Sequence, residues 1–170
     1  MISRFPVFCL LAVALGLAGC SHYQLGTGAA PAFATLYVTP VANQTLLPQA
    51  QSIVSTQLRE AFSTDGRVTL VNSAAEADAT LTVVIHEYHR EAVAARSDDT
   101  GLARKFTLTL GTTCTLRDNR SGKVLFADRA VAAHRDAFTD SGQLQSEYQA
   151  LPLLAAALAQ KVAHTVLDTW

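Results

Sequence analysis

The segment that decides the fold is Phe106-Thr107-Leu108-Thr109-Leu110-Gly111-Thr112-Thr113-Cys114-Thr115-Leu116. Apolar side chains alternate there with threonine and glycine, which is the two-residue period of a β-strand. A strand with one apolar and one polar face is typical of a sheet that is covered on one side only. We therefore expect an open-faced sheet, with Cys114 on its buried side as a packed thiol rather than a nucleophile.

Two flanking segments are predicted to extend this sheet. Ala79 to Arg90 alternates in the same way, with Tyr88 on its more polar face, and the loop from Glu91 to Arg104 that follows is long for a hairpin. Such a loop is a candidate for partner contact. On the other side, a turn cluster leads into a further β-prone segment from Lys123 to Ala133, which predicts a hairpin. A less regular stretch runs from His134 to Ser146.

Two segments have the 3.6-residue period of amphipathic helices. The first runs from Pro48 to Asp65, with Pro48 in the first turn and Gly66 at the stop. The second is expected from about Glu147 to Asp168, with Pro152 in its first turn.

Short elements complete the predicted fold. Thr35 to Pro40 and Val68 to Val71 are β-prone, Asn43 to Pro48 is expected to turn, and Ala74 to Asp78 is an acidic connector. The resulting order is β-α-β-β-β-β-α. The simplest arrangement is an α+β two-layer sandwich, with both helices on one face of a four- to five-stranded mixed sheet.

The N-terminus has the features of a secretory signal. Arg4 precedes an apolar run from Phe5 to Leu17, which is shorter than the about 20 residues of a transmembrane helix. The following Leu17-Ala18-Gly19-Cys20 resembles the bacterial lipobox, which implies removal of residues 1–19 and lipid attachment at Cys20. The alternative is an ordinary signal with a coincidental cysteine.

The mature chain is then a tether and one domain. Residues 20–33 are small and polar, as in a flexible tether, and residues 34–170 suffice for a single domain. Signal removal discards Cys9 and lipid occupies the thiol of Cys20, so Cys114 has no partner for an intramolecular disulfide. It also removes one of 13 basic residues against 14 acidic ones, a balance that gives no global attraction to nucleic acid.

Patterns for catalysis or metal binding are sparse. His86 and His89 lie three apart in a strand-like segment, whereas the zinc-protease pattern needs two histidines four apart on a helix. Lys123 follows a glycine, but the rest of the phosphate-loop pattern is missing. No nucleophile elbow or dinucleotide-binding loop occurs. We therefore expect a protein that is not an enzyme and that holds no cofactor or metal.

Basic side chains form two candidate groups, because donors at strand ends are suited to phosphate or sugar-acid groups. The first group borders the long loop and the second borders the later turn; the alternative is ordinary solvated loop charge mixed with nearby aspartates. The members are Arg90, Arg96, Arg104 and Lys105 in the first group, and Arg117, Arg120 and Lys123 in the second.

A family resemblance rests on residues spread over the mature chain. They are the lipobox, Leu36 to Thr45 (Leu-Tyr-Val-Thr-Pro-Val-Ala-Asn-Gln-Thr), Phe62, Asp65-Gly66-Arg67, Ala77 to Leu81, Tyr88, Arg90-Glu91 and Ser121 to Phe126. This order resembles the LptE family of lipopolysaccharide-assembly lipoproteins. The resemblance implies a non-enzymatic, periplasm-facing outer-membrane lipoprotein that plugs the LptD β-barrel, aids its assembly and contacts lipopolysaccharide.

The resemblance carries over no lipid-binding motif residue by residue. Arg90, Arg96, Arg104 and Lys105 are our candidates for contact with lipid A phosphates. The threonine-rich face of the 106–116 strand is compatible with a hydrated barrel interior. An alternative from another class is a periplasmic lipoprotein that activates a peptidoglycan synthase or assists curli secretion.

Overall fold

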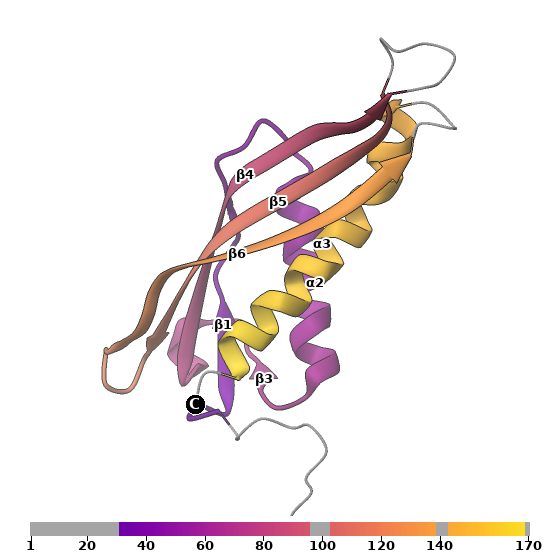
Figure 1. The fold of residues 1–170 in the computed structure, drawn as a ribbon. Coiled ribbons are helices and arrows are strands. Elements are labelled where there is room, and N and C mark those ends of the chain that lie inside the picture. Colours follow the sequence, from indigo (N-terminus) through magenta and orange to yellow (C-terminus); the bar gives the residue numbers. More distant parts are fainter. Residues whose placement is uncertain (1–30, 96–102, 139–142, 169–170) are drawn as a thin grey trace, which may run out of the picture.

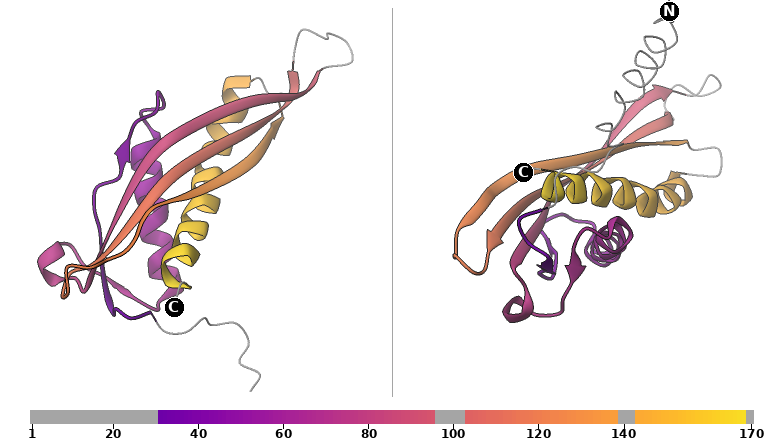
Figure 2. Two further views of the ribbon diagram at one scale, coloured as in Figure 1. Left: turned by 60° about the vertical axis from the view of Figure 1, so that its left-hand side comes forward. Right: turned by 90° about the horizontal axis from the view of Figure 1, so that it is seen from below.

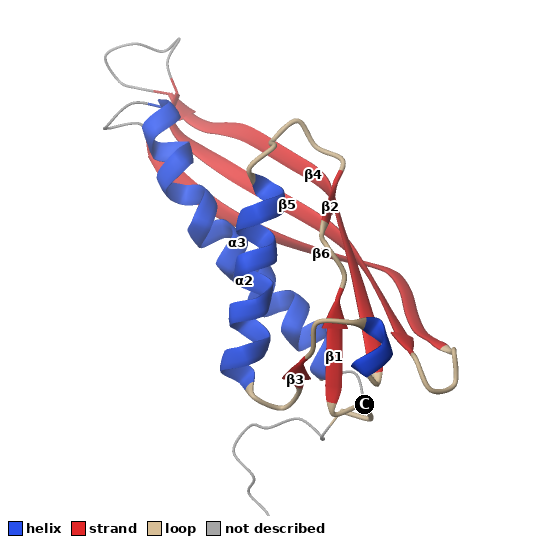
Figure 3. Cartoon of the chain, turned by 180° about the vertical axis from the view of Figure 1, so that it is seen from behind, coloured by secondary structure: helices blue, strands red, loops and turns tan. Residues whose placement is uncertain are grey.

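The computed structural model describes residues 31–95, 103–138 and 143–168 (Figure 1). Two helices cover one face of a six-stranded mixed sheet, whose strand order is β3-β1-β4-β5-β6 with β2 also paired to β4 (Figure 3). The predicted α+β sandwich is confirmed, with slightly more strands than expected. The elements are β1 (Thr35–Val38), β2 (Ala42–Asn43), α2 (Ala50–Asp65), β3 (Thr69–Leu70), the 3-10 helix η2 (Ala74–Glu76), β4 (Ala79–Ala95), β5 (Ala103–Asp118), β6 (Val124–Phe138) and α3 (Gln143–Leu167).

The long antiparallel meander β4-β5-β6 forms most of the sheet, while β1, β2 and β3 pair in parallel at one side. The predicted alternation of β5 is confirmed, because its apolar side chains are buried against the helices. Thr112 shares that buried face and donates its hydroxyl proton to the Val131 carbonyl over 3.2 Å. No helix of the described residues covers the opposite face of the meander (Figure 1).

The ends of the two helices agree only in part with those predicted from the sequence. Gly66 ends α2 with φ of 73°, and its N–H donates to the Phe62 carbonyl over 3.2 Å. Pro48 lies before the helix rather than in its first turn. The prediction for Pro152 is wrong, since α3 begins at Gln143 and includes this proline in its interior. Pro152 is exposed, so water can reach the carbonyl that loses its helical partner.

Strand pairing extends further than composition predicts. The loop predicted over residues 91–104 is shorter, because β4 continues to Ala95 and β5 begins at Ala103. Likewise β6 continues to Phe138, inside the stretch expected to be irregular. Residues rich in charge and alanine join these strands because each has a neighbour in the ladder, which outweighs weak intrinsic β-propensity.

A register shift between Ile85 and Glu87 interrupts β4. Before it, Leu81, Val83 and Ile85 face the helices; after it, Tyr88 pairs with Leu110 and therefore faces the helices too. The prediction that Tyr88 lies on the open face is wrong for this reason, because a one-residue shift exchanges the two faces.

The two ends of the domain differ. The proximal end, defined by residue 31 and Asp168, includes the start of β1, where the Asp78 carboxylate accepts N–H bonds from Ala34 and Thr35 over 2.9 and 3.1 Å. The distal end is defined by Ala95 and the first turn of α3 (Figures 1 and 2). The helix segment Leu144–Leu167 is long and apolar enough to span a membrane, yet 56% of its apolar 18-residue stretch is buried inside the domain.

Candidate interaction surfaces at the distal end

Arg90 lies on the helix side of the sheet, beside the first turns of α3. Its register partner is Leu108, and its guanidinium group lies 5.4 Å from the centre of the Phe106 ring. The same guanidinium forms an ion pair with Glu147 of α3. The Tyr88 hydroxyl also approaches Glu147, at 3.4 Å. These contacts join β4 to α3 at the distal end.

An apolar cleft of about 240 Å³ lies next to this ion pair. Burial raises the pKa of the Tyr88 phenol, and the charge on Glu147 raises it further. Of the lining residues, Leu144 and Tyr148 are 81% and 74% exposed, and Leu46, which precedes the lining residue Leu47, is 102% exposed. Exposed apolar residues grouped in this way mark a binding surface. The lining residues are Leu47, Gln49, Tyr88, Leu144, Glu147, Tyr148 and Leu151.

Lys105 lies on the opposite, open face of the sheet. Its ammonium group is 2.8 Å from the Asp136 carboxylate and 5.9 Å from the centre of the Phe138 ring. Thr107 donates a 2.9 Å hydrogen bond to the same carboxylate. The bonds from Lys105 and then from Thr107 lower the pKa of Asp136. Asp136 is therefore ionised at neutral pH.

The structure does not join Arg90 and Lys105 into one patch, because they face opposite sides of the sheet and each has its own carboxylate partner. Arg96 and the side chain of Arg104 lie outside the described residues, as does Cys20. The apolar cleft was missed by sequence reasoning. Its signal was the uncharged run from Tyr148 to Gln160, which has more apolar residues than one buried helix face needs.

The open face of the meander is polar, with uncharged residues at its centre and charged residues, including Glu91, nearer the distal end. Its centre is formed by threonines of β5, and Thr109 shares a 2.9 Å hydrogen bond with His134 of β6. Gly111 lies opposite Glu87, and a Cβ at Gly111 would come within 2.8 Å of a Glu87 carboxylate oxygen. Glycine thus provides room for Glu87 directly after the β4 bulge.

The second basic group lies at the proximal end. Arg117 donates to the Gly122 carbonyl within its own turn over 3.1 Å, and Arg120 pairs with Asp78 at 2.5 Å. Lys123 is exposed. These contacts fix the β5–β6 turn beside the start of β1.

The histidines and the cysteine that were considered for metal binding or catalysis do not form a site among the described residues. His86 and His89 are exposed, and among the described residues no three metal-ligating side chains come together. Cys114 is fully buried and unpaired, and burial raises the pKa of its thiol to about 11, which confirms the prediction of a packed thiol.

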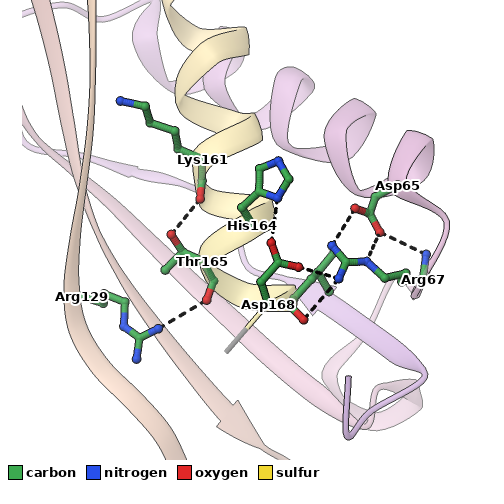
Figure 4. Close-up of polar contacts among 8 residues, drawn as sticks. Asp65, Arg67, Arg129, Lys161, His164, Thr165 and Asp168 are labelled. Atoms are coloured by element: carbon green, nitrogen blue, oxygen red, sulfur yellow. Dashed lines mark hydrogen bonds and ion pairs between the residues drawn. The ribbon is translucent and has the colours of Figure 1, made fainter. Parts of the chain in front are cut away.

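A polar network locks the proximal ends of the two helices (Figure 4). Arg67 lies between Asp65 and Asp168, at 2.7 Å and 2.6 Å respectively. His164 also contacts Asp168, at 2.8 Å. Because Arg67 follows α2 and Asp168 follows α3, this network holds the two helices together far from the distal cleft.

Comparison with known proteins gives one family match. The model of the LptE family, described as lipopolysaccharide-assembly, matches residues 33–166. No curated protein matches the chain.

Solved structures share the fold. An uncharacterised lipoprotein B from Nitrosomonas europaea has a TM-score of 0.54 and 16% identity, over 86% of this chain and 88% of that one. A minor lipoprotein from Acinetobacter baumannii has a TM-score of 0.51 and 19% identity, over 78% and 91%. A protein from Xanthomonas campestris has a TM-score of 0.62 and 11% identity, over 83% and 88%.

Proposed function

Since this chain belongs to the LptE family of lipopolysaccharide-assembly lipoproteins, we propose that it is a non-enzymatic plug and assembly partner of the LptD β-barrel. In this role it serves lipopolysaccharide transport to the outer leaflet, anchored to the outer membrane through lipid on Cys20 and facing the periplasm. The observation that carries the proposal is the extent of the family match, which includes nearly every described residue.

The open face of the meander supports the barrel as partner. Barrel interiors are polar and hydrated, so a surface placed there loses least by being polar without many charges. The threonines of β5 provide such a surface at the centre of the face, while Glu87 and Glu91 add acidic charge beside the paired Lys105 and Asp136 nearer the distal end. An extended face without a covering helix can approach a barrel wall closely (Figure 1).

The distal cleft supports contact with lipopolysaccharide. Lipid A combines phosphates with acyl chains, and the cleft places the Arg90 guanidinium beside exposed apolar side chains. Arginine is suited to phosphate because it presents several donors in one plane. Arg96, Arg104 and Lys105 remain proposed contacts from the neighbouring hairpin.

Lipopolysaccharide binding by a fourfold variant tests these contacts. Changing Arg90, Arg96, Arg104 and Lys105 to glutamine should weaken binding strongly at low salt. A control variant with Arg117, Arg120 and Lys123 changed instead carries a similar loss of charge at the proximal end and should bind almost normally. Equal affinities for the two variants would remove the distal cations from the proposal.

Depletion in the producing bacterium tests the function itself. Loss of the protein should leave LptD immature and reduce lipopolysaccharide at the cell surface. Restoration by the wild-type chain, but not by Cys20→Ala, would support the anchor. Normal LptD maturation together with normal surface lipopolysaccharide after depletion would refute the proposed function.

A further inference from the structure

The outer edge of β6 carries main-chain groups that face away from β5. β6 is the last strand in the sheet order, and β5 pairs with its inner side as far as Phe138. The Ala132 carbonyl accepts a 2.9 Å bond from Lys161 of α3, so it points outward. Main-chain groups alternate in direction along a strand, so those of His134 and Asp136 point outward as well.

The proximal part of this edge is protected against strand pairing. Asp128 has a φ of 48° at a register shift, and Arg129 reaches the Thr165 carbonyl over 3.4 Å. Lys161 covers the Ala132 carbonyl. Bulges and lysines are devices by which proteins blunt sheet edges. Residues 133–138 have no such cover, since their outer side forms no hydrogen bond within the described part of the chain.

The flank of α3 beside this edge is apolar. Lys161 marks the flank, and Ala157 and Leu153 lie one and two turns nearer the distal end on the same side. The eight residues from Leu153 to Lys161 rise about 12 Å, which is about the length of four residues of β6, so Leu153 lies about level with Asp136. Leu153 is 50% exposed and Ala157 is exposed. The helix lies along β6 in two views (Figures 1 and 2).

We propose that the edge at residues 133–138 and the flank at Leu153 and Ala157 together bind an extended segment of the barrel partner by strand addition. Main-chain bonds to His134 and Asp136 would hold the segment, and its alternate side chains would cover the α3 flank. This inference rests on the proposed function and specifies how the two proteins meet.

The cationic side chains beside the edge indicate which residues the added segment carries. Arg135 lies on the helix side of the strand and, like Lys161, has no carboxylate partner among the described residues. The added segment therefore carries apolar residues and at least one acidic residue on that side. A second copy of this chain fits less well, because antiparallel pairing centred on the uncovered edge places Arg135 opposite itself.

Paired variants test the contact by co-purification of tagged, lipidated chain with the barrel. His134→Pro removes an outward N–H without breaking the ladder to β5, and His134→Ala controls for the lost bond to Thr109. Ala157→Glu places a negative charge on the flank, and Gln160→Glu places it on the solvent side. His134→Pro should recover about tenfold less barrel, as expected for loss of one or two hydrogen bonds, and the variant at Ala157 should also recover less because it buries a charge against the segment. Each control should match the wild type.

Hydrogen exchange on the wild-type complex supplies the decisive readout. The outward amides of His134 and Asp136 should exchange at least about tenfold more slowly in the complex than in the free chain. Co-purification without this protection would overturn strand addition and leave the proposed function standing. Absence of barrel from the wild-type sample would overturn both. Protection that increases with concentration in the free chain would identify a second copy as the occupant and overturn the barrel segment.

Discussion

Glu147 competes with any anion for Arg90, and Glu147→Gln should therefore strengthen lipopolysaccharide binding. The carboxylate forms an ion pair with the Arg90 guanidinium at the edge of the distal cleft. A bound phosphate must share or displace this partner. Glutamine keeps the side-chain length and an oxygen that can accept the Tyr88 hydroxyl proton, so the variant removes charge with little change in shape.

The expected gain in affinity follows from the solvent exposure of the Arg90–Glu147 ion pair. The side chains of Arg90 and Glu147 are 42% and 17% exposed, which places their interaction among solvent-screened pairs worth up to about 1 kcal/mol. Release of that competition corresponds to a gain of up to about fivefold in affinity. Unfolding stability should fall by no more than about the same 1 kcal/mol.

The measurement is lipopolysaccharide binding by the mature chain in detergent, at low and high salt. Asp78→Asn is the matched control, because it frees Arg120 at the proximal end, away from the distal cleft. We expect tighter binding for Glu147→Gln alone, with a gain that shrinks as salt screens the charges. Unchanged or weaker binding in a folded variant would refute the placement of the phosphate at Arg90.

Three further predictions concern stability and reactivity. Arg67→Gln should lower the free energy of unfolding by about 1–2 kcal/mol at neutral pH. Hydrogen bonds from Arg67 lower the pKa values of both partner aspartates, so this contribution is complete above about pH 4 and is lost as the pH falls through the lower pKa values of the folded state. The difference from wild type in urea titrations should therefore shrink in acid. Gly111→Val should cost about 1–3 kcal/mol through overpacking, and Glu87→Ala should recover part of it because the 2.8 Å contact disappears; equal melting temperatures for the single and double variants would contradict this. Cys114 should react with a thiol reagent only after unfolding, because its thiol is buried; rapid labelling of the native chain would contradict the packing.

Local patterns predicted the elements of the fold well where one physical effect dominates. The alternation in residues 106–116 located β5, and Asp65-Gly66 located the end of α2 because a left-handed residue there favours glycine. The start of α3 was placed four residues late, at Glu147. Residues 143–146 give no helical signal, because their one apolar side chain, that of Leu144, lines the distal cleft rather than the core.

The candidate site was predicted less well, since it depends on contacts between distant segments. The sequence identified Arg90 and Lys105 as cations near one loop, but their partners Glu147 and Asp136 come from other elements. The cleft likewise joins the loop before α2, the strand β4 and the helix α3. The spacing of residues along the chain does not show which side chains from distant segments will be in contact.

The bulge after Ile85 determines the face of the sheet on which Arg90 lies, and so separates it from Lys105. Continued from the pairing of Ile85 with Thr112, an unbroken ladder would place Arg90 opposite Thr107, on the same open face as Lys105. The shift of one residue instead pairs Arg90 with Leu108 and turns its side chain to the helix side.

This separation makes the two proposed contacts compatible. A phosphate bound at Arg90 would lie with its acyl chains against the distal cleft, on the side of the sheet that the helices cover. The open face and the outer edge of β6 would stay available to the barrel. If Arg90 lay on the open face with Lys105, lipid and barrel would compete for that face, so the bulge would allow the two proposed contacts to form at the same time.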